Sequence, residues 1–175
     1  MTAITPGVAA PDFDMPADGG GRARLADMSG KRVVLYFYPK ADTPGCTNEA
    51  KDFTAHIAAF DAAGAVVIGV SKDPVKKLDK FKAKYDLKVI LASDEESDVC
   101  ERYGVWVEKS MYGKTYMGIE RATFLIGPDG KVAPERRGEG LVRDQRGRIG
   151  KFRKTLPERP DRREAVLSTP SLVTP

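Results

Sequence analysis

Histidine, cysteine and tryptophan are scarce in this sequence, and their scarcity excludes several kinds of site. The 175 residues include one histidine, two cysteines and one tryptophan. A structural zinc site needs three or four cysteine or histidine ligands, and a disulfide scaffold needs several cysteine pairs. We therefore expect no metal and no other cofactor. The two cysteines also lack a Cys-x-x-Cys spacing and fit a reducing compartment.

Long apolar runs are missing as well. No stretch approaches the roughly 20 apolar residues that a membrane-spanning helix needs. The N-terminus carries neither the basic nor the apolar segment of a secretion signal. Hydrophobic residues make up 41% of the chain and charged residues 31%, which is the balance of a globular protein in water. We expect a cytoplasmic protein that does not bind membranes.

The length suits one domain followed by a tail, because a chain of 175 residues buries about two thirds of its unfolded surface without disulfides. We expect one domain over residues 1–156 and a polar, proline-containing, partly disordered tail over residues 157–175. Residues 136–163 hold eleven Arg or Lys and four acids, a net charge of 11 − 4 = +7. This basic segment lacks the interleaved aromatic residues of a nucleic-acid surface, so nucleic acid is not an expected partner.

Apolar patterning predicts alternating strands and helices. Residues 33–38 and 65–70 are continuous apolar runs, typical of strands buried on both faces. Phe53, Ile57 and Phe60 form the apolar stripe of one helix that begins near Pro44. The remaining expected elements are an N-terminal hairpin, helices around 78–85 and over 95–103 and 143–156, and strands over 89–91, 123–126 and 131–136. This order is that of a thioredoxin-like α/β fold.

The segment over residues 36–49 reads Tyr-Phe-Tyr-Pro-Lys-Ala-Asp-Thr-Pro-Gly-Cys-Thr-Asn-Glu and joins the first strand to the first helix. Thr43 and Pro44 are the residue types preferred at a helix N-cap and at the first helical position. Cys46 then lies in the first turn, where unpaired N–H groups and the helix dipole favour a thiolate. The Thr43 hydroxyl either caps the helix or points at whatever the sulfur attacks, and Gly45 leaves room for a small ligand. We expect a reactive thiol.

The spacing of Pro39, Thr43 and Cys46 matches Pro-x-x-x-Thr-x-x-Cys and resembles the peroxiredoxins. The string over residues 36–47 is similar in particular to the bacterioferritin comigratory protein, or PrxQ, subfamily. Further segments that resemble this subfamily lie at residues 93–94, 100–106 and 118–126. The resemblance implies a thioredoxin-like peroxiredoxin fold with a central mixed sheet flanked by helices. It also implies a thiol-dependent peroxidase that reduces hydrogen peroxide and organic hydroperoxides.

The same resemblance implies roles for individual residues. Cys46 would be the catalytic nucleophile, oxidised to a sulfenic acid, and Thr43 and Arg121 would be its catalytic partners. Arg121 directly precedes an apolar strand and matches the active-site arginine of the family. Glu49 follows Cys46 by three residues, so it shares the same helix face and could orient the Arg121 guanidinium. The residues expected to bind the substrate are Pro39, Gly45 and Glu49.

Regeneration of the oxidised sulfur distinguishes this chain from many members of the subfamily. Lys51 occupies the position five residues after Cys46 where many members carry a second cysteine, and Phe81 and Lys82 stand where others carry it. Cys100 is the candidate resolving residue within the chain, but a buried structural thiol is the favoured interpretation. We expect a one-cysteine cycle, in which thioredoxin, glutaredoxin or a low-molecular-weight thiol attacks Cys46 directly.

A second functional class stays open at this level. A peroxide-sensing thiol protein or a holdase would use the same cysteine for signalling and the basic C-terminal segment for a partner, and the rate with hydrogen peroxide separates it from a peroxidase. The protein is expected to be a monomer or a weak dimer. His56 is expected at the surface, and Tyr103 and Trp106 in the core or lining a pocket.

Overall fold

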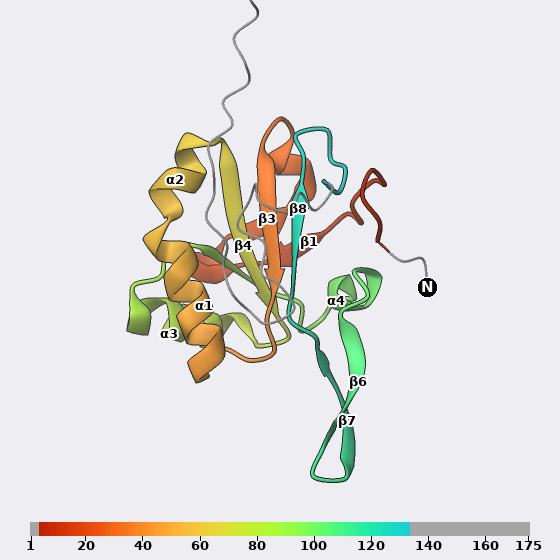
Figure 1. The fold of residues 1–175 in the computed structure, drawn as a ribbon. Coiled ribbons are helices and arrows are strands. Elements are labelled where there is room, and N and C mark those ends of the chain that lie inside the picture. The colour runs from red at the N-terminus through yellow and green to blue at the C-terminus, as the bar shows by residue number, and fades with distance from the viewer. Residues whose placement is uncertain (1–3, 134–175) are drawn as a thin grey trace, which may run out of the picture.

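A four-stranded sheet forms the centre of the computed structural model, which describes residues 4–133 of the chain. The strands lie in the order β5-β4-β3-β8 (Figure 1). Neighbours among β3, β4 and β5 are parallel, and β8 pairs with β3 antiparallel, so the sheet is mixed as predicted. The bounds of these strands are β3 (Arg32–Phe37), β4 (Ala65–Ser71), β5 (Ile90–Ser93) and β8 (Ala122–Ile126).

Helices lie beside the strands, with α1, α2 and α3 on one side and α4 on the other in Figure 1. Short N-terminal elements add a two-stranded antiparallel hairpin, β1 with β2, and thus confirm the expected N-terminal hairpin. The helix bounds are α1 (Pro44–Ala55), α2 (Ile57–Ala62), α3 (Val75–Tyr85) and α4 (Val99–Arg102). The N-terminal bounds are β1 (Asp14–Pro16), η1 (Asp18–Gly20), β2 (Arg22–Arg24) and η2 (Leu25–Met28).

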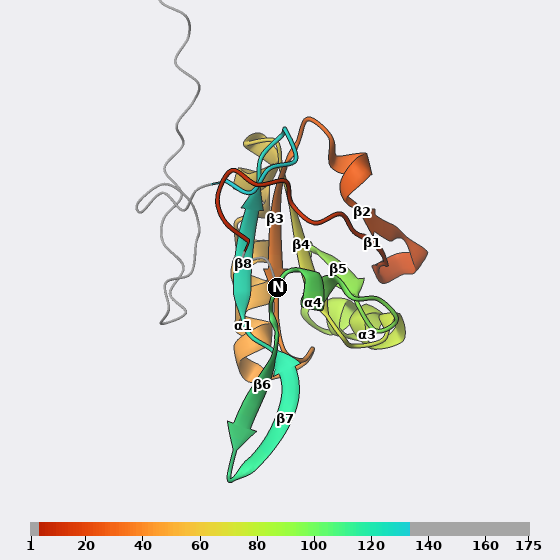
Figure 2. The same cartoon turned by 90° about the vertical axis from the view of Figure 1, so that its right-hand side faces the viewer.

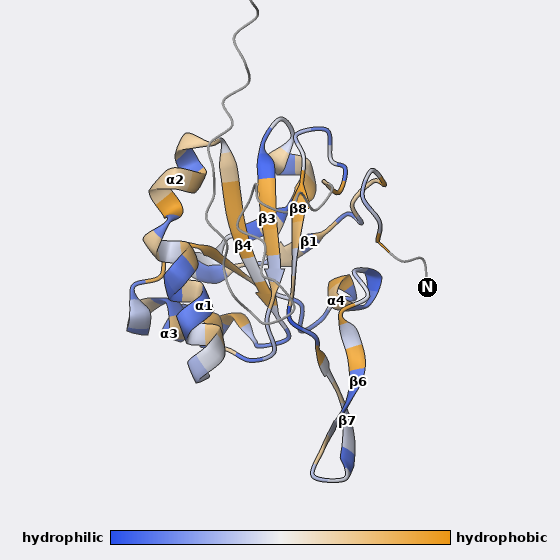
Figure 3. Ribbon diagram, viewed as in Figure 1, coloured by the Kyte–Doolittle hydropathy of each residue, from blue (hydrophilic) through white to orange (hydrophobic). Residues whose placement is uncertain are grey.

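The central sheet separates two hydrophobic cores. Successive residues of β3 point to opposite faces, so Leu35 and Phe37 pack in one core and Val34 and Tyr36 in the other. The core that contains Leu35 also holds buried residues of α4, and we call it the α4-side core. The core that contains Tyr36 holds buried residues of α1, α2 and α3, and we call it the α1-side core. Figure 3 shows β3 and β4 as largely hydrophobic ribbons, as strands covered on both faces require.

Two helices differ from the sequence-based prediction. The helix expected to continue through Phe60 is interrupted at His56, and the two parts are α1 and α2. The helix expected from residue 95 begins only at Val99, because the buried Asp94 carboxylate accepts hydrogen bonds from the backbone N–H groups of Val99 and Cys100. A side chain that caps these amides defines where the helix starts.

A hairpin of β6 (Trp106–Met111) and β7 (Lys114–Ile119) was not predicted. It extends away from the sheet in both Figure 1 and Figure 2. Its turn at Tyr112 and Gly113 has positive φ angles of 51° and 74°. Of the return strand expected over residues 131–136, Lys131 and Val132 form isolated bridges with Ala9 and Ile126. The expected helix over 143–156, the basic segment, the domain end at 156 and the tail over 157–175 lie outside the described residues.

Candidate active site

The loop between β3 and α1 sets the geometry of the site. Thr43 occupies the N-cap position with extended backbone angles, φ −102° and ψ 155°, and its carbonyl oxygen accepts a hydrogen bond from the N–H of Thr47 at 2.8 Å. Pro44 follows as the first helical residue. The Thr43 side chain does not cap the helix; its hydroxyl donates to the carbonyl oxygen of Lys40 at 2.8 Å. The helix start is therefore as predicted, but the hydroxyl is held by the preceding loop.

Cys46 is buried in the first turn of α1, with 3% of its surface exposed. It belongs to the α1-side core, together with Tyr38, Ala41 and Ala50. First-turn N–H groups of a helix have no partner within the helix and carry the positive end of its dipole. The sulfur thus lies at the positive end of α1 and is shielded from bulk water.

Arg121 brings a fixed positive charge to this sulfur. It directly precedes β8, and its Nη2 donates a hydrogen bond to the Cys46 Sγ at 3.2 Å. Its other terminal nitrogen, Nη1, donates to Oε2 of Glu49. Glu49 is fully buried and lies one turn after Cys46 on α1. The carboxylate therefore neutralises and orients a guanidinium that contacts the thiol.

Gly45 and Pro39 are the remaining predicted binding residues, and the structure places them differently. Gly45 is exposed beside Cys46, and a Cβ atom there would lie 3.6 Å from Nη2 of Arg121. An added methyl group would thus narrow the approach to the sulfur without striking the backbone. Pro39 is exposed in the loop, four residues before Thr43. The structure therefore brings Cys46, Arg121, Glu49 and Gly45 together, and places Thr43 and Pro39 in the loop that leads to them.

Asp73 also shapes the site, and the sequence analysis missed it. Its Oδ2 accepts hydrogen bonds from the backbone N–H of Ala41 at 2.7 Å and from the Ser71 hydroxyl at 3.0 Å. It also forms an ion pair with Lys77 at 2.6 Å. In the sequence, Asp73 stands directly before Pro74 and so fits the pattern of a helix start. The same aspartate in addition anchors the loop before Cys46.

Cys100 lies on the other side of the central sheet. It is fully buried in the α4-side core, whereas Cys46 belongs to the α1-side core. Burial, together with the neighbouring Asp94 carboxylate, raises the pKa of the Cys100 thiol far above its usual value. A disulfide needs Cα atoms within roughly 7 Å of each other. This placement agrees with a structural thiol rather than a resolving one.

Three other residues considered from the sequence lie away from Cys46. His56 is exposed at the junction of α1 and α2. Tyr103 is buried in the α4-side core, and its hydroxyl donates to the carbonyl oxygen of Pro11 at 2.8 Å. Trp106 packs partly buried against the same core, with the Lys72 ammonium 5.3 Å from its ring centroid. Neither aromatic residue belongs to the α1-side core that surrounds Cys46.

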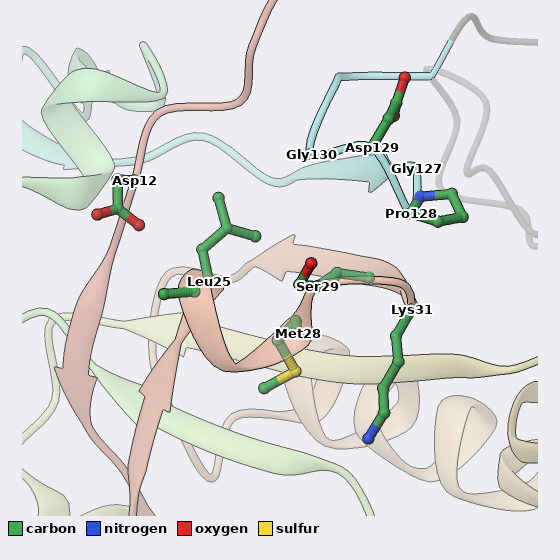
Figure 4. A pocket seen from close by; sticks show the side chains of 11 residues that line it. Asp12, Leu25, Met28, Ser29, Lys31, Gly127, Pro128, Asp129 and Gly130 are labelled. Carbon is green, nitrogen blue, oxygen red and sulfur yellow. The ribbon is translucent and has the colours of Figure 1, made fainter.

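A cavity of about 300 Å³ lies at the other end of β3 (Figure 4). Val33, at the start of that strand, lines it, whereas Cys46 follows the end of the strand. The cavity is therefore separate from the thiol site. Within residues 4–133, no three His, Cys, Asp or Glu side chains are grouped so that they could hold a metal ion. No helix in the same part of the chain is both long and apolar enough to cross a bilayer.

The sequence matches that of known proteins over most of the described region. The AhpC/TSA family model matches residues 6–134. A putative peroxiredoxin bcp of Coxiella burnetii is 48% identical over 149 residues, which cover 83% of this chain and 99% of that protein. Peroxiredoxin Bcp of Escherichia coli is 46% identical over 132 residues, 75% of this chain and 85% of the relative. Peroxiredoxin Bcp of Bacillus subtilis is 47% identical over 129 residues, which cover 74% of this chain and 82% of that protein.

Solved structures are similar to the same region. The bacterioferritin comigratory protein of Xanthomonas campestris, studied for its alkyl peroxide reduction activity, superposes with a TM-score of 0.68 at 43% identity, over 74% of this chain and 83% of that one. A cysteine-to-serine mutant of Xylella fastidiosa PrxQ gives a TM-score of 0.70 at 35% identity, over 75% and 84%. These matches agree with the geometry of the site, in which the Cys46 thiol at the start of α1 contacts the Arg121 guanidinium and the buried Glu49 carboxylate binds that guanidinium. The chain therefore belongs to the AhpC/TSA family, and it is a peroxiredoxin of the Bcp or PrxQ kind, a thiol-dependent peroxidase.

Proposed function

We propose that this peroxidase reduces hydrogen peroxide and organic hydroperoxides through a sulfenic acid at Cys46. The proposal is supported above all by the hydrogen bond from Arg121 Nη2 to the Cys46 Sγ at 3.2 Å. The thiolate attacks one oxygen of the peroxide, an S–O bond forms and the O–O bond breaks. The departing oxygen takes a proton and leaves as water or an alcohol. The sulfur is oxidised to sulfenic acid while the peroxide is reduced.

Arg121 serves this reaction by compensating negative charge. The charge begins on the sulfur and ends on the departing oxygen, so a donor that reaches both atoms stabilises the transition state. The guanidinium contacts the sulfur directly, and the buried Glu49 holds it in place. The backbone N–H groups at the start of α1, at Gly45 and Cys46, supply further donors. The exposed Gly45 leaves the approach open.

Thr43 is proposed to orient the peroxide. A hydroxyl group has one proton to donate and two lone pairs that accept. The Thr43 hydroxyl donates its proton to the Lys40 carbonyl oxygen, so its lone pairs remain for the O–H proton of a peroxide. Donors on one side and an acceptor on the other would align the O–O bond with the sulfur. Pro39, earlier in the same loop, is proposed to exclude water from the bound peroxide.

Regeneration is proposed to follow a one-cysteine cycle. Cys100 lies in the core on the opposite side of the sheet, so an external thiol attacks the sulfenic sulfur of Cys46. An S–S bond forms and water leaves; a second thiol then breaks the mixed disulfide and returns the Cys46 thiol. Thioredoxin, glutaredoxin or a low-molecular-weight thiol would fill this role. Such reductants operate in a reducing compartment, which supports a cytoplasmic location. The protein is proposed to work as a monomer or weak dimer.

Peroxide consumption by wild-type protein and by Cys46→Ser tests the proposal, with Cys100→Ser as the matched control. In the presence of dithiothreitol or thioredoxin, wild type and Cys100→Ser should consume hydrogen peroxide and cumene hydroperoxide over many turnovers. Cys46→Ser should consume neither. Continued turnover by Cys46→Ser would contradict the proposal. Oxidation without turnover in wild type would instead indicate a peroxide-sensing thiol protein.

A further inference from the structure

Asp42 has an unusual backbone conformation immediately before the site. Its φ angle is 63°, in the left-handed region, and it is one of three non-glycine residues with positive φ within residues 4–133. Aspartate tolerates this region better than most residues, yet the conformation still costs on the order of 1 kcal/mol. Asp42 directly precedes Thr43, which forms the N-cap of α1. Some contact must therefore hold the loop in this form.

The contact comes from the last turn of α3. The Tyr85 hydroxyl donates to Oδ1 of Asp42 at 2.6 Å, and the Lys84 ammonium lies 3.0 Å and 2.9 Å from the two carboxylate oxygens. The Tyr85 hydrogen bond, followed by that of Lys84, lowers the pKa of the Asp42 carboxyl below its usual value of 3.8. Hydrogen bonds to a charged acceptor are stronger than neutral ones. The contacts with α3 thus favour the ionised form of Asp42.

Tyr85 is itself held by contacts with its own helix, α3, and with α1. Its ring packs edge-on against the buried Phe81, with centroids 5.6 Å apart. The ammonium group of Lys51, on α1, lies 5.1 Å from its ring centroid, and that of Lys84 lies 5.2 Å away. Cations at this distance are attracted to the face of an aromatic ring. Tyr85 therefore links α1, α3 and the loop at Asp42.

The rest of the loop is held by adjacent contacts. The Lys40 carbonyl oxygen accepts from the Thr43 hydroxyl, and the Ala41 N–H donates to Asp73. Asp42 completes this series, and a change in its backbone angles would move Thr43 and the first turn of α1. A misplacement of about 1 Å in a catalytic group can lower a rate by roughly 100-fold. The contact with α3 is therefore in a position to control the chemistry at Cys46.

We propose that Asp42 is a positioning residue, which acts through Tyr85 and Lys84 to hold Thr43 and the first turn of α1 in the reactive arrangement. The inference rests on the proposed peroxidase function and extends it to residues outside the motif. Cys46 does not have to reach a second cysteine in the proposed cycle. A loop that stays fixed during turnover is therefore compatible with regeneration by an external thiol.

Four variants test this role. Tyr85→Phe removes one hydroxyl and keeps the ring, and Tyr116→Phe, at an exposed tyrosine of β7, is the matched control. Asp42→Gly adopts the positive φ freely but loses the carboxylate, whereas Asp42→Asn keeps both tolerance for this φ and an acceptor for Tyr85. If the contact matters, Asp42→Gly is impaired and Asp42→Asn is close to wild type. If only the backbone angle matters, Asp42→Gly is unimpaired.

Three quantities are measured on each variant: the second-order rate of Cys46 oxidation by hydrogen peroxide, the unfolding midpoint, and hydrogen exchange at the Thr47 amide, which bonds to the Thr43 carbonyl. In Tyr85→Phe and Asp42→Gly, Cys46 should be oxidised about 10-fold more slowly than in wild type, and the Thr47 amide should exchange faster. Both variants should keep the same unfolding midpoint as the Tyr116→Phe control. Three results would overturn the inference. Tyr85→Phe could react or exchange like wild type, Asp42→Gly could react at the wild-type rate, or the unfolding midpoint of Tyr85→Phe could fall by a large amount.

The exchange measurement keeps this inference separate from the proposed function. If wild-type protein does not reduce peroxide, the proposed function fails, and amide exchange alone decides whether Asp42 and Tyr85 position the loop. If wild-type protein reduces peroxide and Tyr85→Phe does so equally fast, the inference fails and the proposed function stands.

Discussion

The guanidinium of Arg121 donates a hydrogen bond to the Cys46 sulfur at 3.2 Å across 75 positions of sequence. The register of the sheet produces this contact. Ala122, the first residue of β8, pairs with Phe37, the last residue of β3. Arg121 therefore lies just beyond the end of β3, where the loop to α1 begins. One strand pairing thus places the cation beside a thiol that another segment supplies.

Arg121 is predicted to need both its charge and its two terminal nitrogens. Arg121→Lys keeps the charge, but a single ammonium cannot bind Glu49 and the Cys46 sulfur in the same fork geometry. The peroxide rate should fall by about 10- to 100-fold. Single-turnover oxidation followed by mass spectrometry checks this. A wild-type rate in folded Arg121→Lys would show that the reaction does not require one side chain to bind both Glu49 and the Cys46 sulfur.

Arg121→Ala should also destabilise the fold, because it leaves the buried Glu49 without this cation. Removing one partner of a buried ion pair costs about 3–5 kcal/mol, and Glu49 is fully buried. The double variant Arg121→Ala with Glu49→Gln should regain much of that stability and stay slow with peroxide. Urea unfolding beside the rate measurement separates the two effects. If the double variant reacts with peroxide at the wild-type rate, Arg121 is not needed for the chemical step.

The Thr43 hydroxyl is predicted to act on the chemical step. Thr43→Val keeps the shape and removes the hydroxyl, so the rate with hydrogen peroxide should fall by roughly 100- to 1,000-fold, as when a transition-state hydrogen bond is deleted. Thr43→Ser retains the hydroxyl and serves as the control. The side chain does not cap α1, so Thr43→Val should lose only the hydrogen bond to the Lys40 carbonyl oxygen, which is about 0.5–1.5 kcal/mol of unfolding free energy. Equal rates in the two variants would exclude the proposed role.

Cys100 is predicted to be dispensable for turnover. Cys100→Ala should form the Cys46 sulfenic acid and be reduced by external thiol at the wild-type rate, because the central sheet separates the two thiols. Mass spectrometry after one equivalent of peroxide, without added thiol, should show sulfenic acid and no intramolecular disulfide in wild type. A Cys46 to Cys100 disulfide in high yield, together with lost turnover in Cys100→Ala, would establish Cys100 as the resolving residue.

Asp94 is predicted to make the fold sensitive to acid. Burial tends to raise the pKa of its carboxyl, but hydrogen bonds from Ser97, Cys100 and Val99 oppose it, and the net pKa lies below the usual 3.8. A group with a lowered folded pKa stabilises the native state above its unfolded pKa, and this contribution is lost as the pH falls below that value. The free energy of unfolding should drop more steeply from about pH 5 to pH 3 in wild type than in Asp94→Asn. Equal slopes would contradict the prediction.

Local patterns in the sequence were enough to predict the elements on which the thiol depends. The apolar run of β3 and the proline at the start of α1 depend on residues within a few positions, so spacing and periodicity reveal them. Arg121 was instead identified by the resemblance to the peroxiredoxins. The helix break at His56 and the late start of α4 were missed. The first is not visible in the apolar stripe, and the second depends on Asp94 bonds that form only in the fold. The hairpin of β6 and β7 was missed because more than half of its strand residues are exposed and show little apolar alternation.

Contacts between distant segments were decided by tertiary structure alone. The pairing of β8 with β3 places Arg121 at Cys46, and the alternation of side chains across β3 assigns the two cysteines to opposite cores. Likewise, Tyr85 reaches Asp42 only because α3 packs beside the loop. Sequence by itself determined that Cys46 begins a helix after a buried strand, since that follows from local chemistry. Which charges and thiols lie near it depends on strand register and sheet face, and a one-dimensional pattern does not contain these.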